Sequence, residues 1–237
     1  MIEMELTTIY LLAAKGWKKR VACLLRLRGI FIEAVKFTDY LKKKLIKIKS
    51  EKQLAKDDFY NFVHLRQLEK LSIKRWHLEL RDRDIQWATS FLPNLKKLKF
   101  FKTRLPWSDM RLIGILSNLE VLKMIHACLG EKWEPSEGGF RQLKRLVIED
   151  TCLEYWNAVG DHFPVLEHLE LSGCNLLRKI PIEFAYITTL ALIQLKKCSN
   201  SVFVSALCIR DEQLRYGNDG LCVRSKHIQV SPVPNGL

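Results

Sequence analysis

The sequence contains none of the short motifs that mark the common catalytic and ligand-binding sites. It has no Gly-x-x-x-x-Gly-Lys-Ser/Thr phosphate loop, no Gly-x-Ser-x-Gly turn and no His-Glu-x-x-His pair, and these chemistries depend on those spacings. Its six histidines are scattered, and no two cysteines stand at Cys-x-x-Cys spacing. We therefore expect that the chain is not an enzyme, and we expect neither a metal site nor a cofactor.

Features of secreted proteins are also missing. No Asn-x-Ser/Thr glycosylation signal occurs, and an odd number of cysteines, seven, cannot all be paired in disulfides within one chain. The apolar run from Leu6 to Ala14 is too short to span a bilayer. It also follows Glu3 and Glu5, whereas a signal peptide begins with basic residues. We expect a cytoplasmic protein with reduced thiols and no transmembrane segment, and peripheral attachment to a membrane is the alternative.

Acidic residues are scarce at one end of the chain. The formal net charge is +13, and residues 1–75 contain 18 lysines and arginines against 8 acidic residues. Over residues 76–237 the counts are 21 and 18. Nucleic-acid-binding domains are usually basic over a whole face or domain, so nucleic acid is an unlikely partner and the excess of lysine needs a local explanation.

A repeat of about 24 residues runs through most of the sequence. The apolar pattern Leu-x-x-Leu-x-Leu occurs with first positions 27, 24, 24, 23 and 24 residues apart, at Leu68, Leu95, Leu119, Leu143, Leu166 and Leu190. Two more apolar positions keep the same phase, three residues before and ten residues after each first position, and only Asn200 breaks the pattern. This spacing is typical of leucine-rich repeats. We predict an α/β fold, a curved leucine-rich-repeat solenoid of about six repeats.

The spacing also predicts which side chains are buried. Residues two apart in a strand face the same side, so the strand leucines face the core and the residues between them face a concave surface. We expect strands at 70–74, 97–101, 121–125, 145–149, 168–172 and 192–196, with Leu98, Leu122, Leu146 and Leu169 nearly fully buried.

The residues on the predicted concave surface are the candidate protein-binding site. They are strongly basic in the first three repeats and mixed, with acidic residues, in the fourth and fifth. The candidate site residues are Lys70, Lys74, Arg75, Lys97, Lys99, Phe101, Lys102, Lys123 and Ile125. An acidic protein surface would neutralise these lysines, although lysines on exposed strands also deter aggregation, and both interpretations stay open.

Cysteine and tryptophan recur with the repeat as well. Four of the seven cysteines fall just after a predicted strand, at Cys128, Cys152, Cys174 and Cys198. We expect them to be small buried turn residues, with redox or metal chemistry as the alternative. Trp107, Trp133 and Trp156 recur 12 to 14 residues after their motif starts. We expect them to cover the core on the convex side, with an exposed aromatic platform as the alternative.

The two ends depart from the repeat. We expect a solenoid over 59–200, then a cap over 201–224 and a flexible tail over 225–237. The cap should contain a helix from Ser205 to Tyr216, stopped by Gly217, and a last strand near Leu221. Residues 1–58 form an uncertain basic N-terminal region, which is either helical over 21–40 or a degenerate repeat, because Ile46 precedes Leu71 by 25 residues.

Several segments outside the repeat frame carry a family resemblance. The segments Phe91 to Leu98, Lys132 to Gly138 with its Trp-Glu-Pro, and Gly217-Asn218-Asp219 resemble the C-terminal leucine-rich-repeat region of plant NB-ARC-LRR (NLR) disease resistance proteins. The likeness is strongest to the late blight resistance protein homologue group of nightshade relatives, and it covers about residues 62–224.

The resemblance implies a protein-binding module, a fragment or truncated form of an intracellular immune receptor that acts in defence by recognition or autoinhibition. The implied partners are a nucleotide-binding switch domain, a pathogen-derived protein or a host protein, with no small-molecule substrate. The ATP/ADP-binding domain of such receptors would lie in the parent protein, and its motifs are absent here. A leucine-rich-repeat adaptor of another system, such as a ubiquitin-ligase substrate adaptor, is the alternative.

Overall fold

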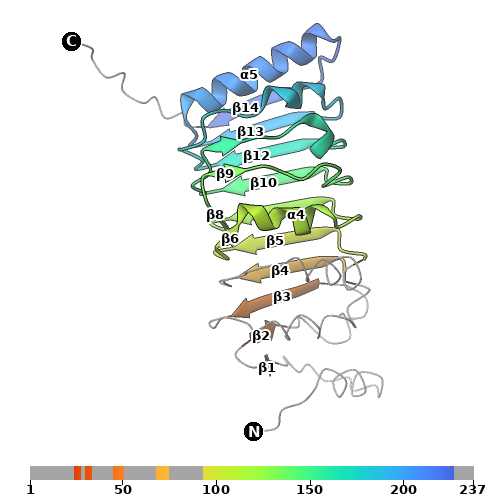
Figure 1. The fold of residues 1–237 in the computed structure, drawn as a ribbon, viewed down its shortest axis with the longest axis vertical. Helices are drawn as coiled ribbons and strands as arrows, with labels where there is room; N and C mark the ends of the chain where they lie inside the picture. Colours follow the sequence, from red (N-terminus) through yellow and green to blue (C-terminus); the bar gives the residue numbers. More distant parts are fainter. Residues whose placement is uncertain (1–23, 28–29, 34–44, 51–67, 75–92, 227–237) are drawn as a thin grey trace, which may run out of the picture.

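Parallel strands stacked along one axis dominate the protein (Figure 1). A computed structural model describes residues 68–74 and 93–226, together with the backbone of residues 24–27, 30–33 and 45–50. In this part of the chain the largest sheet has ten strands, in the order β1-β2-β3-β4-β5-β7-β10-β12-β13-β14. From β3 to β14 each strand is parallel to the next.

Six of these strands have the predicted bounds. They are β4 (Lys70–Lys74), β5 (Lys97–Phe101), β7 (Val121–Ile125), β10 (Arg145–Glu149), β12 (His168–Ser172) and β13 (Leu192–Lys196). Their register is constant, so that equivalent residues of successive repeats are partners, for example Leu98 with Leu122 and Leu122 with Leu146. Neighbouring parallel strands need a return segment between them. The arrangement is compatible with an α/β solenoid.

The core lies on one side of this sheet. Leu98 is 3% exposed, and Leu122, Leu146 and Leu169 are 0% exposed, as predicted. The apolar residues three positions before the motif are buried too, at Leu116, Phe140, Phe163 and Ile187. Each coil thus closes over the same apolar positions, and stacking joins them into one core.

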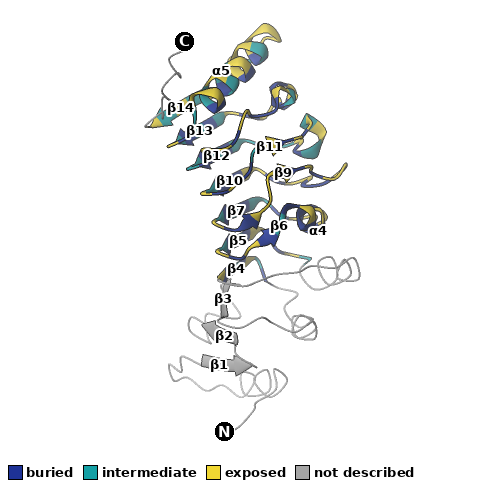
Figure 2. Cartoon of the chain, turned by 60° about the vertical axis from the view of Figure 1, so that its left-hand side comes forward, coloured by how far each residue is buried: buried dark blue, intermediate teal, exposed yellow. Residues whose placement is uncertain are grey.

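The return segments cover the core side of the main sheet (Figure 2). Each return segment is short, because it only has to connect the end of one strand to the start of the next. Their regular elements are β6 (Leu105–Pro106), η4 (Trp107–Asp109), α4 (Met110–Gly114), β8 (Cys128–Leu129), β9 (Lys132–Trp133), β11 (Tyr155–Trp156), η5 (Gly160–His162) and η6 (Ile182–Tyr186).

Aromatic rings fill the space beneath the return segments. The Trp107 and Trp133 rings stack with centroids 4.8 Å apart, and Trp133 and Trp156 stack at 5.2 Å. All three side chains are buried, so they cover the core as predicted and the alternative of an exposed aromatic platform is wrong for them. Offset stacking of rings adds to the free energy gained from burial.

One set of predicted core positions is only half correct. Ten residues after the motif start, Leu105 and Leu153 are buried, but Leu129 is 42% exposed and Leu176 is 57% exposed. The adjacent residues Cys128 and Leu177 are buried instead. In β8 successive side chains face opposite sides, so burial of Cys128 turns Leu129 outward.

The C-terminal end replaces the return segment with a long helix. Helix α5 (Asn200–Arg215) begins earlier than the predicted Ser205, which explains why Asn200 breaks the apolar pattern. Its residues Val202, Ala206, Ile209 and Gln213 are buried. Gly217, at φ 80°, follows its last turn as predicted. Strand β14 (Cys222–Lys226) then adds to the sheet beside β13, and the predicted tail after Lys226 lies outside the described residues.

The N-terminal region also contributes strands. Strand β3 (Leu45–Ser50) pairs parallel with β4, and Ile46 is the partner of Leu71, which supports the degenerate-repeat alternative. The helical alternative is wrong where the structure describes the chain, because β1 (Leu24–Leu27) and β2 (Ile30–Glu33) are strands. Strand β2 pairs antiparallel with β3. As strands, β1 and β2 pair their backbone N–H and C=O groups with a neighbouring strand at the open edge of the sheet. This pairing prevails over the weak helical pattern of the local sequence.

Candidate protein-binding face

Three rows of side chains cross the face of the main sheet that is opposite the core. They belong to the first, third and fifth residue of each strand, and constant register aligns them. Most are exposed or half-buried. Because neighbouring strands lie about 4.8 Å apart, residues of one row are close enough to act on one partner together.

The structure brings the predicted site residues together on this face. Lys70, Lys97 and Lys99 occupy the first and third rows of β4 and β5, and Lys123 is the register partner of Lys99. Lys74, Phe101 and Ile125 share the fifth row, and Lys102 directly follows Phe101. Arg75 lies outside the described residues. The predicted positions are therefore contiguous.

We call Lys70, Lys97, Lys99 and Lys123 the basic strip. Within the described part of the chain, none of these four lysines forms an ion pair. The neighbouring Lys96, which is not on this face, forms one with Glu69 at 3.9 Å. Like charges directly opposite one another on a sheet are destabilising. The strip is thus a surface whose charge is not compensated by its neighbours.

The basic strip continues toward the N-terminus in the backbone register. Lys47 and Lys49 of β3 are the register partners of Ser72 and Lys74. Both fall in the third and fifth rows, at the strand that precedes β4. Two lysines of the basic N-terminal region therefore share the rows of the predicted site.

Phe101 is the aromatic residue at the edge of the basic strip. The amino groups of Lys74 and Lys102 lie 5.9 Å and 5.5 Å from the centre of its ring. The His126 ring meets it edge-on at 6.4 Å. Cations over an aromatic face are attracted to it, so Phe101 holds two lysines in place beside half-buried Ile125 and gives this part of the face an apolar centre.

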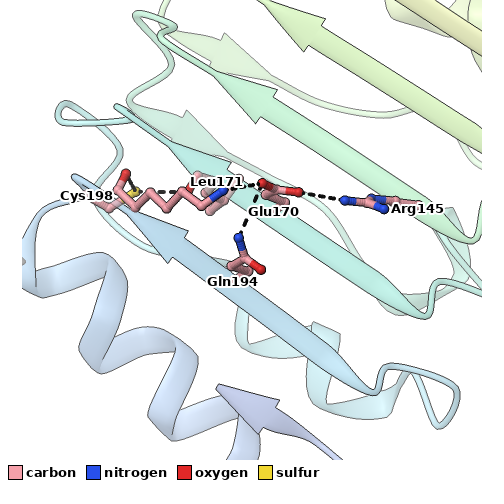
Figure 3. Close-up of polar contacts among 6 residues, drawn as sticks. Arg145, Glu170, Leu171, Gln194 and Cys198 are labelled. Atoms are coloured by element: carbon pink, nitrogen blue, oxygen red, sulfur yellow. Dashed lines mark hydrogen bonds and ion pairs between the residues drawn. The ribbon is translucent and has the colours of Figure 1, made fainter. Parts of the chain in front are cut away.

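The C-terminal half of the face is organised around Glu170 (Figure 3). Its Oε2 accepts a bond from Arg145 at 2.9 Å, and its Oε1 accepts bonds from Lys196 at 2.9 Å and from Gln194 at 3.4 Å. These residues come from β10, β12 and β13. The Glu170 side chain is 18% exposed. Both carboxylate oxygens are engaged, so this half of the face is neutralised from within.

The electrostatics of Glu170 follow from these contacts. Partial burial raises the pKa of its carboxyl group, but the hydrogen bonds from Lys196 and Arg145 outweigh burial. The pKa of Glu170 therefore lies below its ordinary value. The alternation of side chains in the predicted strand 168–172 puts Glu170 on this face but does not identify it as a centre. The signal in the sequence that could have identified it is that Arg145 and Lys196 stand about one repeat before and one repeat after Glu170.

A second feature lines the ends of the strands. The residue after β5, β7, β10, β12 and β13 has a positive φ, at Lys102, His126, Asp150, Gly173 and Lys197. The N–H groups of His126 and Asp150 donate to the last carbonyls of the next strands, Glu149 and Ser172. His126 also lies 3.2 Å from the Asp150 carboxylate. At Gly173, where φ is 62°, a Cβ would meet that carboxylate, so any other residue is strained there and displaces the Asp150 side chain.

The cysteines that the structure describes lie in or near the turns after the strands, in helix α5 and in β14. The six at described positions are unbridged, and Cys128, Cys174 and Cys198 are buried as predicted, but Cys152 is exposed. Cys174 and Cys198 donate to backbone carbonyls of the preceding strands, Ile148 and Leu171, which is a structural role in the turn. The hydrogen bond from Cys174 lowers the pKa of Cys198 to about 7. Cys23 lies outside the described residues.

The described residues match neither of two further patterns, a cluster of metal ligands and a membrane-spanning helix. They contain no group of three or more His, Cys, Asp or Glu side chains that could hold a metal ion. None of their helices is long and apolar enough to cross a membrane.

The chain is similar to several putative late blight resistance protein homologs of Solanum demissum. It is 40% identical to one of them over 125 residues, which are 52% of this chain and 10% of that protein. It is 39% identical to a second homolog over 125 residues, 52% of this chain and 16% of that protein. It is 34% identical to a third over 148 residues, 61% of this chain and 13% of that protein.

The match covers a small part of each relative. The chain spans between 10% and 16% of the length of these three proteins. No protein-family model matches the chain. The likeness agrees with the resemblance seen in the Trp-Glu-Pro and Gly-Asn-Asp segments.

Proposed function

We propose that the chain is a protein-binding leucine-rich-repeat module from a plant disease resistance receptor, and that it binds an acidic protein surface on strands β4, β5 and β7. It takes part in defence by recognition or autoinhibition and catalyses no reaction. Similarity to late blight resistance homologs supports the defence role. The basic strip, whose four lysines form no ion pair with another described residue and have no acidic register partner in β4, β5 or β7, is the observation that carries the binding role.

The geometry favours a protein partner over a small molecule. The strip lies on an open sheet face, where side chains from neighbouring strands are about 5 Å apart. Beside it, Lys74 and Lys102 lie against the ring of Phe101, and Ile125 is the register partner of Phe101, so charged groups adjoin an apolar centre. A mixed surface of this kind suits an acidic protein segment that also carries an apolar residue, because charges speed association and burial of the apolar residues slows dissociation.

The partner classes follow from the receptor resemblance. They are a nucleotide-binding switch domain, a pathogen-derived protein or a host protein, met in the cytoplasm. The nucleotide would be bound by the parent receptor's own domain, so we propose no cofactor for this segment. A ubiquitin-ligase adaptor remains the second candidate on sequence grounds, and no observation in the structure favours it.

A labelled peptide of ten glutamates, with a central leucine added, tests the surface. We expect binding by fluorescence anisotropy to weaken as salt is raised, because the attraction is between partly exposed charges. Reversing Lys97, Lys99 and Lys123 to Glu should lower the association rate on the order of tenfold or more. The matched control reverses Lys132, Lys144 and Lys179, which lie on return segments and turns.

The two triple variants have the same net charge, so a general attraction of a basic protein for an acidic peptide would affect both equally. Equal loss of binding in both variants, or in neither, would show that the basic strip is not the binding surface.

A further inference from the structure

The two halves of the exposed face differ in whether their cations have acidic partners. In the N-terminal half the lysines of the basic strip have no carboxylate partner among the described residues. In the C-terminal half Arg145 and Lys196 both bind Glu170, at 2.9 Å each. The boundary between the halves falls between β7 and β12, at the strand that carries Arg145.

Arg145 and Lys196 occupy the same rows as the residues of the predicted site. Arg145 continues the first row from Lys97 through Val121. Lys196 continues the fifth row, which begins with Lys74 and Phe101. Without Glu170, these two cations would extend the basic surface across β10 and β13.

We propose that Glu170 sets the C-terminal limit of the docking surface, by engaging Arg145 and Lys196 so that an acidic protein segment is confined to β4, β5 and β7. This inference rests on the proposed function. Glu170 is a specificity residue that acts through its two cations and does not touch the partner.

The contacts explain how one carboxylate can bind both Arg145 and Lys196. Its two oxygens point toward cations on opposite sides, one on β10 and one on β13 (Figure 3). Gln194 adds a third donor at 3.4 Å and helps to fix the carboxylate between them. A bidentate or multiply bonded carboxylate holds its cations more firmly than a single exposed pair does, so an approaching acidic segment gains little from displacing it.

The other acidic residue on this part of the face provides a matched control. Glu149 lies in the fifth row of β10, next to Ile125 and Ser172. It forms no ion pair with another described residue. Glu149→Gln and Glu170→Gln therefore change the net charge of the same face by the same amount, but only the second variant releases Arg145 and Lys196.

The experiment uses the glutamate peptide described above with a carbodiimide, which joins lysine amines to carboxylates that touch them, and mass spectrometry to find the joined lysines. In the parent chain we expect peptide on Lys97, Lys99 and Lys123, and Lys196 joined to Glu170. In Glu170→Gln we expect peptide on Lys196 as well. Affinity by anisotropy should rise on the order of three- to tenfold, the range for two added exposed charge pairs.

Further variants separate the possible outcomes. Adding Arg145→Gln and Lys196→Gln to Glu170→Gln should return the affinity to the parent value or below. If Glu170→Gln binds no more tightly than Glu149→Gln and shows no peptide on Lys196, the boundary role of Glu170 is wrong while the proposed function stands. If the parent shows no peptide on the basic strip, the proposed function fails and this inference fails with it.

Discussion

The two halves of the sheet share one core and differ on the opposite face. The second residue of both β7 and β12 is a leucine on the core side, and Leu122 and Leu169 are both 0% exposed. Above them, Lys123 of β7 has no ion pair among the described residues, whereas Glu170 of β12 binds two cations. The core rows repeat because every coil has to fill the same space, and the exposed rows are free to differ.

This difference separates stability from recognition in the protein. A substitution in a core row should have the same effect in either half, because the surroundings repeat. A substitution in an exposed row should depend on the half, because only the C-terminal half contains compensating charges. The predictions below test this division, from the largest expected effect to the smallest.

The core should be equally sensitive in the two halves. We expect Leu122→Ala and Leu169→Ala each to lower the free energy of unfolding by about 2–5 kcal/mol, through lost burial and the cavity that remains. Urea denaturation followed by circular dichroism measures both. A cost for one variant that is less than half of the other would show that the two halves do not share one uniform core.

The turn at Gly173 should be sensitive in a way that the equivalent turns are not. Gly173→Ala should cost about 1–3 kcal/mol, because a residue with a Cβ is strained at φ 62° and the new Cβ also meets the Asp150 carboxylate. Lys102 and His126 occupy the same kind of left-handed turn without glycine, so the contact with Asp150 is the part of the cost that is specific to Gly173.

A double-mutant cycle with Asp150→Ala isolates the collision. We expect Asp150→Ala to restore part of the stability lost in Gly173→Ala, with a coupling free energy on the order of 0.5–3 kcal/mol. Additive effects of the two substitutions would mean that the backbone conformation, rather than Asp150, requires the glycine.

Glu170 should contribute to stability in a pH-dependent way. Its pKa is lower in the folded protein than its ordinary value of 4.5, so its contribution is complete above pH 4.5 and disappears as the pH falls through the lower folded pKa. Because the network is partly exposed and screened, Glu170→Gln should cost no more than about 1 kcal/mol at neutral pH. The difference from the parent should shrink steadily as the solution is acidified, as measured by urea denaturation at a series of pH values from neutral into acid.

Removing a charge from the N-terminal half should either raise the free energy of unfolding or leave it unchanged. We expect Lys99→Gln to change the free energy of unfolding by less than about 0.5 kcal/mol, with any change stabilising, because Lys97 and Lys123 repel Lys99. The stabilisation should shrink in high salt. A clear loss of stability in Lys99→Gln would mean that the basic strip has a structural partner, and the contrast between the halves would be weaker.

Much of the fold follows from apolar spacing. All six predicted strands occur at their predicted bounds, because a strand with alternating leucines has one face that must be buried wherever it stands in the chain. The candidate site residues lie side by side for the same reason, since the register that aligns the leucines also aligns the residues between them. The charge difference between the repeats was visible in the sequence too.

Other features depend on contacts that spacing does not specify. Leu129 and Leu176 point outward although they keep the apolar phase, because Cys128 rather than Leu129 is the register partner of buried Leu105, and Leu177 is buried in place of Leu176. Helix α5 begins at Asn200 because its buried residues pack against η6 and β14, and the sequence pattern alone suggested a later start. The strands β1 and β2 form where the local pattern was closer to that of a helix.

The sequence by itself determined the repeat, the core rows and the basic excess on one part of the exposed face, because these depend on the alternation of side chains along a strand. Only the tertiary structure decided which charges are compensated. Glu170 lies 25 residues from Arg145 and 26 from Lys196, and a bond to both depends on side-chain direction across three strands. An ion pair forms over a few ångströms, and register brings residues that close without specifying whether their charged groups meet.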